Sequence, residues 1–337
     1  MKLIRVQLRN FRSIREADIR ISPFSLIIGP NGAGKSGFLQ FFPTVLNFAS
    51  KVVPEVSPGK AGHPFQPSDA WRRHLNHPDE EGWFSLEWEE APGKTATFGG
   101  SHRGIHQAAA YPWEPGSVTI YAFDAKRIAR QDGKAEHGRI GADGRGLNHV
   151  LAALGKEPEP TLFRAIETHL QMCVPEIEGL DIVGMDSSHP AIHVRERGLH
   201  EPVPAALLSE GTLIILGMLT LLLQKDPPRV ILIEDVDRGM HPRLFERLAE
   251  VLETLALKRG VTLLASTHNP YLVDCFMERQ EAVIVVEKNE GVTTLANLDE
   301  RMESYAYDEE TAGEMPLGSL WFSGLVGGVP ETWRRKR

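Results

Sequence analysis

Eight consecutive residues near the N-terminus have the types and the spacing of a loop that binds phosphate groups. Positions 29–36 read GPNGAGKS and fit the pattern G-x-x-x-x-G-K-[ST]. Glycines at 32 and 34 let the backbone turn its N–H groups inward as a nest for an anion. The lysine adds a positive charge for the β- and γ-phosphates, and the serine hydroxyl is a ligand for Mg²⁺. The residues expected to hold nucleotide phosphates are Gly29, Pro30, Asn31, Gly32, Ala33, Gly34, Lys35 and Ser36.

Two carboxylates follow an apolar run much later in the chain. Residues 230–233 (VILI) have the pattern of a buried strand, and Glu234 and Asp235 come directly after them. Acidic residues at the carboxyl end of such a strand lie where an open α/β sheet binds ligands. We expect Glu234 to hold Mg²⁺ through its water shell, and Asp235 to orient or deprotonate the attacking water. A polar turn before the next helix is the alternative, and the upstream phosphate loop argues against it.

Two further segments carry weaker signals for nucleotide chemistry. Ser209 and Gly211 open a long apolar helix, where a hydroxyl, free N–H groups and the helix dipole can hold an anion. An ordinary helix cap is the alternative. His268 follows an apolar strand and can reach a γ-phosphate from there, although an isolated histidine is more often a plain loop residue. The order of all four segments along the chain favours the nucleotide interpretation.

Strands and helices in a suitable order are predicted around these segments. A strand-like alternation covers residues 3–9, an apolar strand covers 24–28, and a helix is expected over 35–42, with Pro43 limiting it. The last third is regular: a helix from about 211, a strand at 230–233, a helix at about 242–258, a strand at 261–265 and a hairpin around 289–291. Such alternation predicts an α/β fold with a mixed or parallel sheet.

The middle of the chain has a different texture, rich in Pro, Gly, His and Trp from about 50 to 140. Phe84, Leu86 and Trp88 alternate as on one face of a strand, and helical periodicity returns over 147–173, followed by two short strand-like segments at about 180–197. We therefore divide the chain into an ATPase-type core, residues 1–50 and 200–337, and an inserted lobe that is partly β and partly helical, residues 51–199.

Taken together, the ordered motifs resemble those of ABC-type ATPases, in particular the branch that contains the SMC, RecF and OLD-type (overcoming lysogenisation defect) proteins. NFRS at 10–13 resembles the opening N-F-[KR]-S of that branch, and LSEGT resembles its signature L-S-[DG]-G-T. EDVDRGMHP is similar to its Walker B and D-loop segment, and STHNPYLVD to its switch-histidine segment. The resemblance covers about residues 1–50 and 200–300.

The resemblance implies a P-loop NTPase of ABC type that binds ATP with Mg²⁺ and hydrolyses it to ADP and phosphate. It further implies a homodimer that closes on ATP head to tail, with Ser209 and Gly211 of one protomer covering the γ-phosphate on the other. By the same resemblance, Arg12 lies near the phosphates, and Glu234, Asp235 and His268 are the catalytic residues. No glutamine is identified for the Q-loop of the family.

The sequence departs from the family pattern at the carboxylates. Glu234 is the metal carboxylate, and Asp235 fills the catalytic-glutamate position with a side chain one methylene shorter. Val236 and Asp237 replace the expected Pro and Glu. A poorly placed general base costs about 10²–10⁴ in rate, so we expect slow hydrolysis. One alternative is a nucleotide-gated scaffold with little hydrolysis. Another is the ATPase subunit of a transporter, which the NFRS opening and the long stretch before LSEGT disfavour.

Composition limits the partners that the chain can have. The 337 residues carry a formal net charge of −8, which gives no support to nucleic-acid binding, and the run of basic residues at 334–337 reads as a solvated tail. Two cysteines and the lack of a long apolar segment favour a reduced, cytoplasmic protein without membrane contact. By analogy with the OLD-like branch, the nucleotide cycle is expected to control either DNA engagement or a separately encoded effector, with phage defence as a further analogy. Histidine pairs at 74/77 and 102/106 are not expected to bind metal, and neither a coiled coil nor a nuclease domain is predicted.

Overall fold

The computed structural model describes residues 2–52, 82–101, 104–108, 118–130, 135, 138–184, 188–304 and 315–329. The chain forms two compact units. The first unit comprises Met1–Ile120, Arg229–Leu232 and Thr262–Arg337, and the second unit comprises Tyr121–Pro228 and Ile233–Val261. These boundaries differ from the predicted core and inserted lobe. Residues 82–120 belong to the same unit as the phosphate loop, and the LSEGT segment belongs to the other unit.

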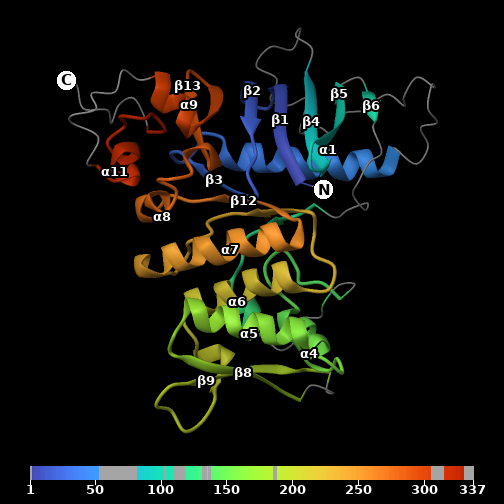
Figure 1. Cartoon of the computed structure of the whole chain (residues 1–337), viewed down its shortest axis with the longest axis vertical. Helices are drawn as coiled ribbons and strands as arrows, with labels where there is room; N and C mark the ends of the chain where they lie inside the picture. The colour runs from blue at the N-terminus through green and yellow to red at the C-terminus, as the bar shows by residue number, and fades with distance from the viewer. Residues whose placement is uncertain are drawn as a thin grey trace. The chain divides into compact units, whose positions relative to one another are not determined.

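The first unit is built on a mixed sheet whose strand order is β6-β5-β4-β1-β2-β14-β13-β3-β12-β11-β7. β3 pairs in parallel with β12 and β13, and β14 pairs in parallel with β2, whereas β1, β2, β4 and β5 form an antiparallel part. In Figure 1, β2, β1 and β4 run side by side. The strands are β1 Lys2–Phe11, β2 Ile14–Arg20, β3 Phe24–Ile28, β4 Trp83–Ala91, β5 Lys94–Ser101, β6 Gly104–Ala108, β7 Ile120–Tyr121, β11 Val230–Ile233, β12 Thr262–Ser266, β13 Val283–Asn289 and β14 Val292–Asn297.

The helix after the phosphate loop is longer than the sequence predicts. α1 runs over Lys35–Val52 and contains Pro43, which was expected to limit it. A proline inside a helix costs about 3 kcal/mol, because it removes one backbone hydrogen bond and crowds the preceding turn. Beyond Pro43, the side chains of Val45 and Leu46 are fully buried, and each such burial contributes about 1.5–3 kcal/mol. The free energy gained by burying these two side chains therefore offsets the cost of the proline, and the helix continues.

An aromatic core joins α1 to the antiparallel part of the sheet. The rings of Phe11 and Phe41 lie edge to face with centroids 5.4 Å apart, and Phe41 meets Phe84 at 6.0 Å. Phe84, Leu86 and Trp88 of β4 are all buried, as their alternation predicts. The first segment of the middle region thus extends the sheet that carries the phosphate loop.

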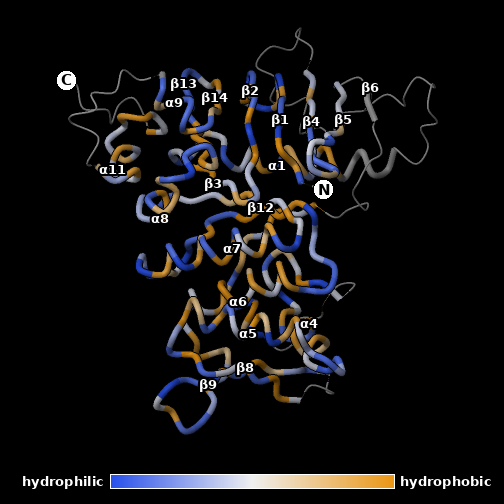
Figure 2. Tube along the Cα trace, viewed as in Figure 1, coloured by the Kyte–Doolittle hydropathy of each residue, from blue (hydrophilic) through white to orange (hydrophobic). Residues whose placement is uncertain are grey.

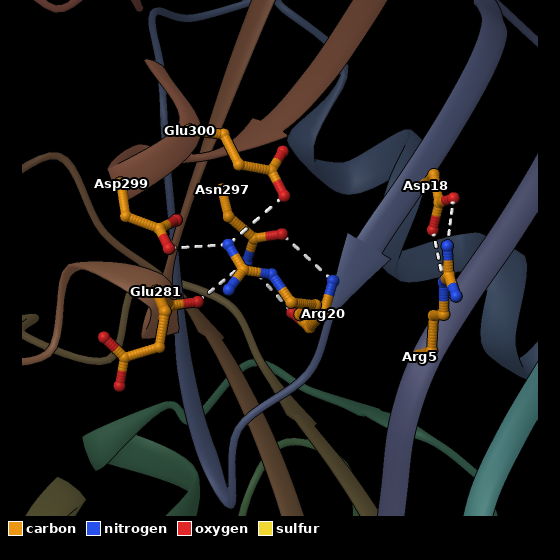
Figure 3. A network of polar contacts seen from close by, with 7 residues as sticks. All are labelled: Arg5, Asp18, Arg20, Glu281, Asn297, Asp299 and Glu300. Carbon is orange, nitrogen blue, oxygen red and sulfur yellow. Dashed lines mark hydrogen bonds and ion pairs between the residues drawn. The ribbon is translucent and has the colours of Figure 1, made fainter. Parts of the chain in front are cut away.

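A polar clamp fixes the end of β14 against the end of β2 (Figure 3). The Asn297 side chain accepts from the Arg20 N–H at 3.0 Å, and its Nδ2 donates to the carbonyls of Arg20 at 3.0 Å and Glu281 at 2.7 Å. Asn297 is buried, so these hydrogen bonds leave no unsatisfied amide behind. The Arg20 guanidinium also pairs with Asp299 at 2.6 Å, at the exposed surface, where an ion pair contributes little.

The second unit combines helices with a small antiparallel sheet of order β10-β9-β8. Its central helix, α6, is buried from Gly211 to Leu223, and its tube is largely orange in Figure 2. The elements are α3 Ala125–Ile128, α4 Leu147–Gly155, α5 Thr161–Cys173, β8 Ile177–Val183, β9 Ala191–Glu196, β10 Val203–Pro204, α6 Glu210–Leu223 and α7 Phe245–Arg259. Within the described residues, none of the helices combines the length and the apolar character that crossing a bilayer needs.

Three short helices complete the first unit: α8 Pro270–Asp274, α9 Leu298–Ser304 and α11 Leu317–Phe322. The predicted hairpin is present, because β13 and β14 pair antiparallel with Asn289 opposite Val292. Its two loop residues, Glu290 and Gly291, both have positive φ, 48° and 84°, which is typical of a type I′ turn.

Candidate nucleotide-binding site

The phosphate loop, residues 29–36, connects the carboxyl end of β3 to the first turn of α1. Gly32 and Gly34 have φ of 76° and 120°, a region in which a side chain is strained, so glycine suits both positions. Gly29 is restricted by space as well, since a Cβ atom there would lie 2.3 Å from the Val286 carbonyl oxygen. The glycines of the motif thus shape a tight loop above α1, whose N-terminus carries partial positive charge.

Lys35 brings a charge to the loop itself. Its side chain is nearly buried, 8% exposed, and Nζ donates to the carbonyl oxygens of Gly29 at 2.8 Å and Pro30 at 3.1 Å. A buried ammonium group needs such acceptors, because its charge is costly away from water. Ser36 is exposed in the first turn of α1. The ammonium group and the hydroxyl therefore lie at the same end of the helix, as phosphate and metal binding require.

The structure brings the phosphate loop and His268 to one pocket of about 1000 Å³. Its lining includes Gly29, Pro30 and Asn31 of the loop together with His268, which follows β12. The backbone N–H of Thr267 donates to the Ile27 carbonyl at 3.1 Å and so ties the end of β12 to the end of β3. Two segments that are remote in the sequence thus share one cavity because their parent strands are neighbours in the sheet.

The far wall of this pocket comes from residues 315–329, which we call the C-terminal segment. Tyr271 of α8 and Phe322 of α11 both line the pocket, and their side chains are 61% and 75% exposed. Gly318 lies so close to α8 that a Cβ atom would be 2.1 Å from the Pro270 carbonyl oxygen. Its N–H donates to Asp274 Oδ1 at 2.7 Å. Sequence reasoning did not find this wall, since no motif links the segment to α8.

A buried ion pair holds the other end of the C-terminal segment. Glu287 of β13 pairs with Arg301 of α9, and Glu287 Oε1 also accepts from the Gly328 N–H at 2.7 Å. The Gly328 carbonyl in turn accepts from the Trp321 indole at 3.1 Å. The segment that bounds the pocket is therefore fixed by hydrogen bonds at both ends.

Arg12 occupies a strained turn between β1 and β2, with a φ of 52°. Burial lowers the pKa of its guanidinium from the usual value, and the group lies 5.6 Å from the centroid of the Phe11 ring. Its Nε atom has no hydrogen-bond partner among the described residues. Such a group is suited to bind an anion, and its placement beside nucleotide phosphates stays a prediction.

Glu234 and Asp235 belong to the second unit. The Glu234 N–H donates to the Tyr121 carbonyl at 2.9 Å, which fixes the backbone at the end of β11. Asp235 then adopts a left-handed conformation with a φ of 51°, and its side chain is exposed. Its carbonyl accepts from the Arg238 N–H at 3.1 Å, so the chain turns here, as the alternative interpretation also expected. The turn presents the carboxylate of Asp235 to solvent.

The LSEGT segment also lies in the second unit, where Ser209 caps α6. Its hydroxyl accepts from the Thr212 N–H at 3.1 Å and lies 2.7 Å from the Thr212 hydroxyl. Gly211 packs against the turn after Asp235, since a Cβ atom there would lie 2.7 Å from the Gly239 carbonyl oxygen. The ordinary cap and an anion site use the same exposed helix end, so the geometry fits both interpretations.

The histidine pairs at 74/77 and 102/106 lie outside the residues whose side chains the structure describes. Within the described part of the chain, His, Cys, Asp and Glu side chains form no group of three or more that is suited to hold a metal ion.

Two family profiles match the chain on either side of the middle region. Residues 1–69 match a family described as "AAA ATPase domain", and residues 125–274 match one described as "AAA domain, putative AbiEii toxin, Type IV TA system". The first match contains Arg12 and the phosphate loop. The second contains the LSEGT segment, both carboxylates and His268. The chain therefore carries an AAA/ABC-like ATPase domain.

One curated relative shares a short stretch with this chain. The OLD nuclease of Thermus scotoductus is 32% identical over 89 residues, which cover 25% of this chain and 16% of the nuclease. The match thus spans less than a fifth of the length of that relative. Its similarity supports the OLD-like branch of the predicted resemblance.

Solved structures with the same fold include heads of SMC proteins. The SMC head domain from Thermotoga maritima is 15% identical, with 88% of this chain and 99% of that chain covered and a TM-score of 0.54. The Smc head domain from Pyrococcus furiosus, bound to the C-terminal domain of ScpA, is 12% identical, with coverage of 90% and 98% and a TM-score of 0.56. The predicted α/β fold of ABC type and the resemblance to the SMC, RecF and OLD-like branch are confirmed.

Proposed function

We propose that this protein binds ATP together with Mg²⁺, hydrolyses it slowly, and uses ATP to close a homodimer that controls a separate effector. The observation that carries this proposal is the shared pocket of the phosphate loop and His268. A cationic loop at a helix N-terminus binds the phosphates, and the histidine that follows the neighbouring strand lines the same cavity, where it can contact the terminal phosphate.

The remaining residues of the proposed site have chemistry that suits a magnesium nucleotide. Ser36 and Glu234 offer the oxygen ligands that Mg²⁺ prefers, and both are at least partly accessible. When bound, the ion neutralises charge on the β- and γ-phosphates. Asp235 is the proposed base for the attacking water, and Arg12 is a proposed phosphate contact.

The family resemblance and the position of Ser209 support the proposed homodimer. Ser209 is exposed at the positive end of α6, and the second protomer would present its hydroxyl together with Gly211 to the γ-phosphate. Dimer closure then depends on a phosphate that hydrolysis removes, so ATP shifts the population between monomer and dimer. The similarity to an OLD nuclease supports, as an analogy, a DNA-related process under the control of the ATP cycle.

A nucleotide-gated scaffold with little hydrolysis is the second candidate, and Asp235 is the residue that favours it. Its carboxylate is one methylene shorter than the glutamate of the family, and a left-handed backbone directs it. A general base displaced by the length of one methylene group can lose most of its contribution to the rate of ATP hydrolysis. In this case ATP would close the dimer and ADP would rarely form.

Lys35→Ala tests the proposal through ATP affinity and turnover. Removing the ammonium group should weaken MgATP binding on the order of 100-fold and abolish steady-state hydrolysis, since a charge-assisted contact to phosphate is lost. Binding of a fluorescent ATP analogue and phosphate release measure the two effects.

Lys225→Ala is the matched control, because this lysine belongs to the second unit, its side chain is 78% exposed, and no role in nucleotide binding is proposed for it. Wild-type turnover no higher than that of Lys35→Ala would leave only the scaffold. A wild-type protein with no ATP affinity at all would reject the proposed function.

A further inference from the structure

A chain of hydroxyl groups lies directly behind the phosphate loop. Thr293 of β14 is fully buried, and its Oγ1 donates to the Ala33 carbonyl at 2.7 Å. Ser13 follows Arg12 in the NFRS turn, and its hydroxyl lies 2.8 Å from the same Thr293 Oγ1. Ser13 of the turn between β1 and β2 and Ala33 of the phosphate loop therefore both form hydrogen bonds with the buried Thr293 of β14.

The direction of the two hydrogen bonds follows from a count of protons. A threonine hydroxyl has one proton, and the Ala33 carbonyl can only accept, so Thr293 uses its proton there. Ser13 must then donate to Thr293 Oγ1. We call this the hydroxyl relay: Ser13 Oγ–H to Thr293 Oγ1–H to the Ala33 carbonyl.

The relay orients a peptide group of the phosphate loop. The Ala33–Gly34 peptide is trans, so its N–H points away from its carbonyl. A carbonyl held by Thr293 on the sheet side thus directs the Gly34 N–H to the opposite side, where a phosphate nest needs its donors. Gly34 also permits the approach, since a Cβ atom there would lie 2.7 Å from Thr293 Oγ1.

The rest of β14 is fixed firmly enough to serve as a support. The Thr293 N–H donates to the Ser13 carbonyl at 2.6 Å, and Thr293 pairs with Ile14 of β2. At the far end of the strand, the buried Asn297 clamps β14 to Arg20 (Figure 3). The position of Thr293 is therefore set from both sides.

We propose that Thr293 is a positioning residue for nucleotide binding, and that the hydroxyl relay from Ser13 pre-organises the phosphate loop. This inference rests on the proposed function, because it names what holds the loop in its phosphate-binding shape. A loop that already has its N–H groups in place spends less binding free energy on ordering itself.

Thr293→Val removes the hydroxyl and keeps the shape of the side chain. Thr294→Val is the matched control, since the same change falls one residue along β14, on the exposed side of the strand. We expect Thr293→Val to weaken MgATP binding about tenfold relative to Thr294→Val, as the loss of a buried hydrogen bond implies. Thr293→Ser, which restores the hydroxyl, should recover affinity to within about threefold of wild type. Titration calorimetry with MgATP measures all four proteins.

Equal affinities of Thr293→Val and Thr294→Val would overturn the relay while leaving ATP binding intact. Absence of ATP binding by the wild type would instead reject the proposed function. If Thr293→Val does not fold, Ser13→Ala tests the hydrogen bond from Ser13 to Thr293 alone. The affinity of this variant for MgATP should fall about two- to fivefold. A Ser13→Ala protein with wild-type affinity would then contradict the relay.

Discussion

Asp235 combines an exposed carboxylate with a left-handed backbone. Its carboxylate is exposed at the end of a buried strand, and its backbone has a φ of 51°. Aspartate and asparagine tolerate this left-handed region better than other side chains with a Cβ atom, because their short polar groups bond locally. Strained residues of this kind concentrate at functional sites, so the conformation agrees with a role in catalysis.

Asp235→Asn separates the chemistry of this residue from its conformation. Asparagine keeps the size and the tolerance for positive φ but cannot accept the proton from water, so kcat should fall about 10²–10⁴-fold while the free energy of unfolding stays unchanged. Phosphate release and urea unfolding measure the two quantities. Asp226→Asn, at an exposed position, is the control. A variant that hydrolyses ATP at the wild-type rate would show that Asp235 is not the general base.

At the scale of elements, the start of α6 and the turn after β11 fit together through two glycines. Gly239 has a φ of 68°, and its carbonyl lies where a Cβ atom on Gly211 would be. The LSEGT segment and the EDVDRGMHP segment are therefore packed closely against each other. A change at one of them moves the other, because neither backbone has room to adjust alone.

Gly211→Ala should therefore lower the free energy of unfolding by about 1–3 kcal/mol, the usual cost of overpacking a close contact. Gly37→Ala is the matched control in α1, where a Cβ atom would meet nothing within 4 Å and the better helix former should add about 0.5–1 kcal/mol. Urea denaturation followed by circular dichroism compares the two. Equal midpoints for both variants would show that the close approach of Gly211 to Gly239 is absent in solution.

Local sequence patterns predicted helices and strands well where packing in the core favours the same structure. The strand at 230–233 and the hairpin around residue 290 have the predicted positions, since apolar runs and a glycine turn leave few alternatives. The predicted end of the helix at Pro43 was wrong, because the free energy that a proline costs a helix is smaller than the free energy gained by burying Val45 and Leu46. Contacts such as Thr293 with Ala33 could not be predicted, because they depend on which strands become neighbours.

At the scale of the molecule, the order of motifs predicted the fold and the family resemblance but not the division into units. The segments Arg229–Leu232 and Thr262–Arg337 return to the first unit, whereas Ile233–Val261 belongs to the second. The predicted division has a single inserted lobe, whereas the chain passes between the two units four times. The pocket wall formed by the C-terminal segment could not be predicted either, because it depends on a contact between α8 and α11, in which the Gly318 N–H donates to Asp274.

The central claim, an ATP-driven homodimer, is tested most directly by the mass of the purified protein in solution. Light scattering with Mg²⁺ should compare protein without nucleotide, with ADP, with ATP and with a non-hydrolysable ATP analogue. We predict a monomer without nucleotide and with ADP, a stable dimer with the analogue, and a dimer with ATP that decays as ATP is hydrolysed. One unchanged mass under all four conditions would contradict the account.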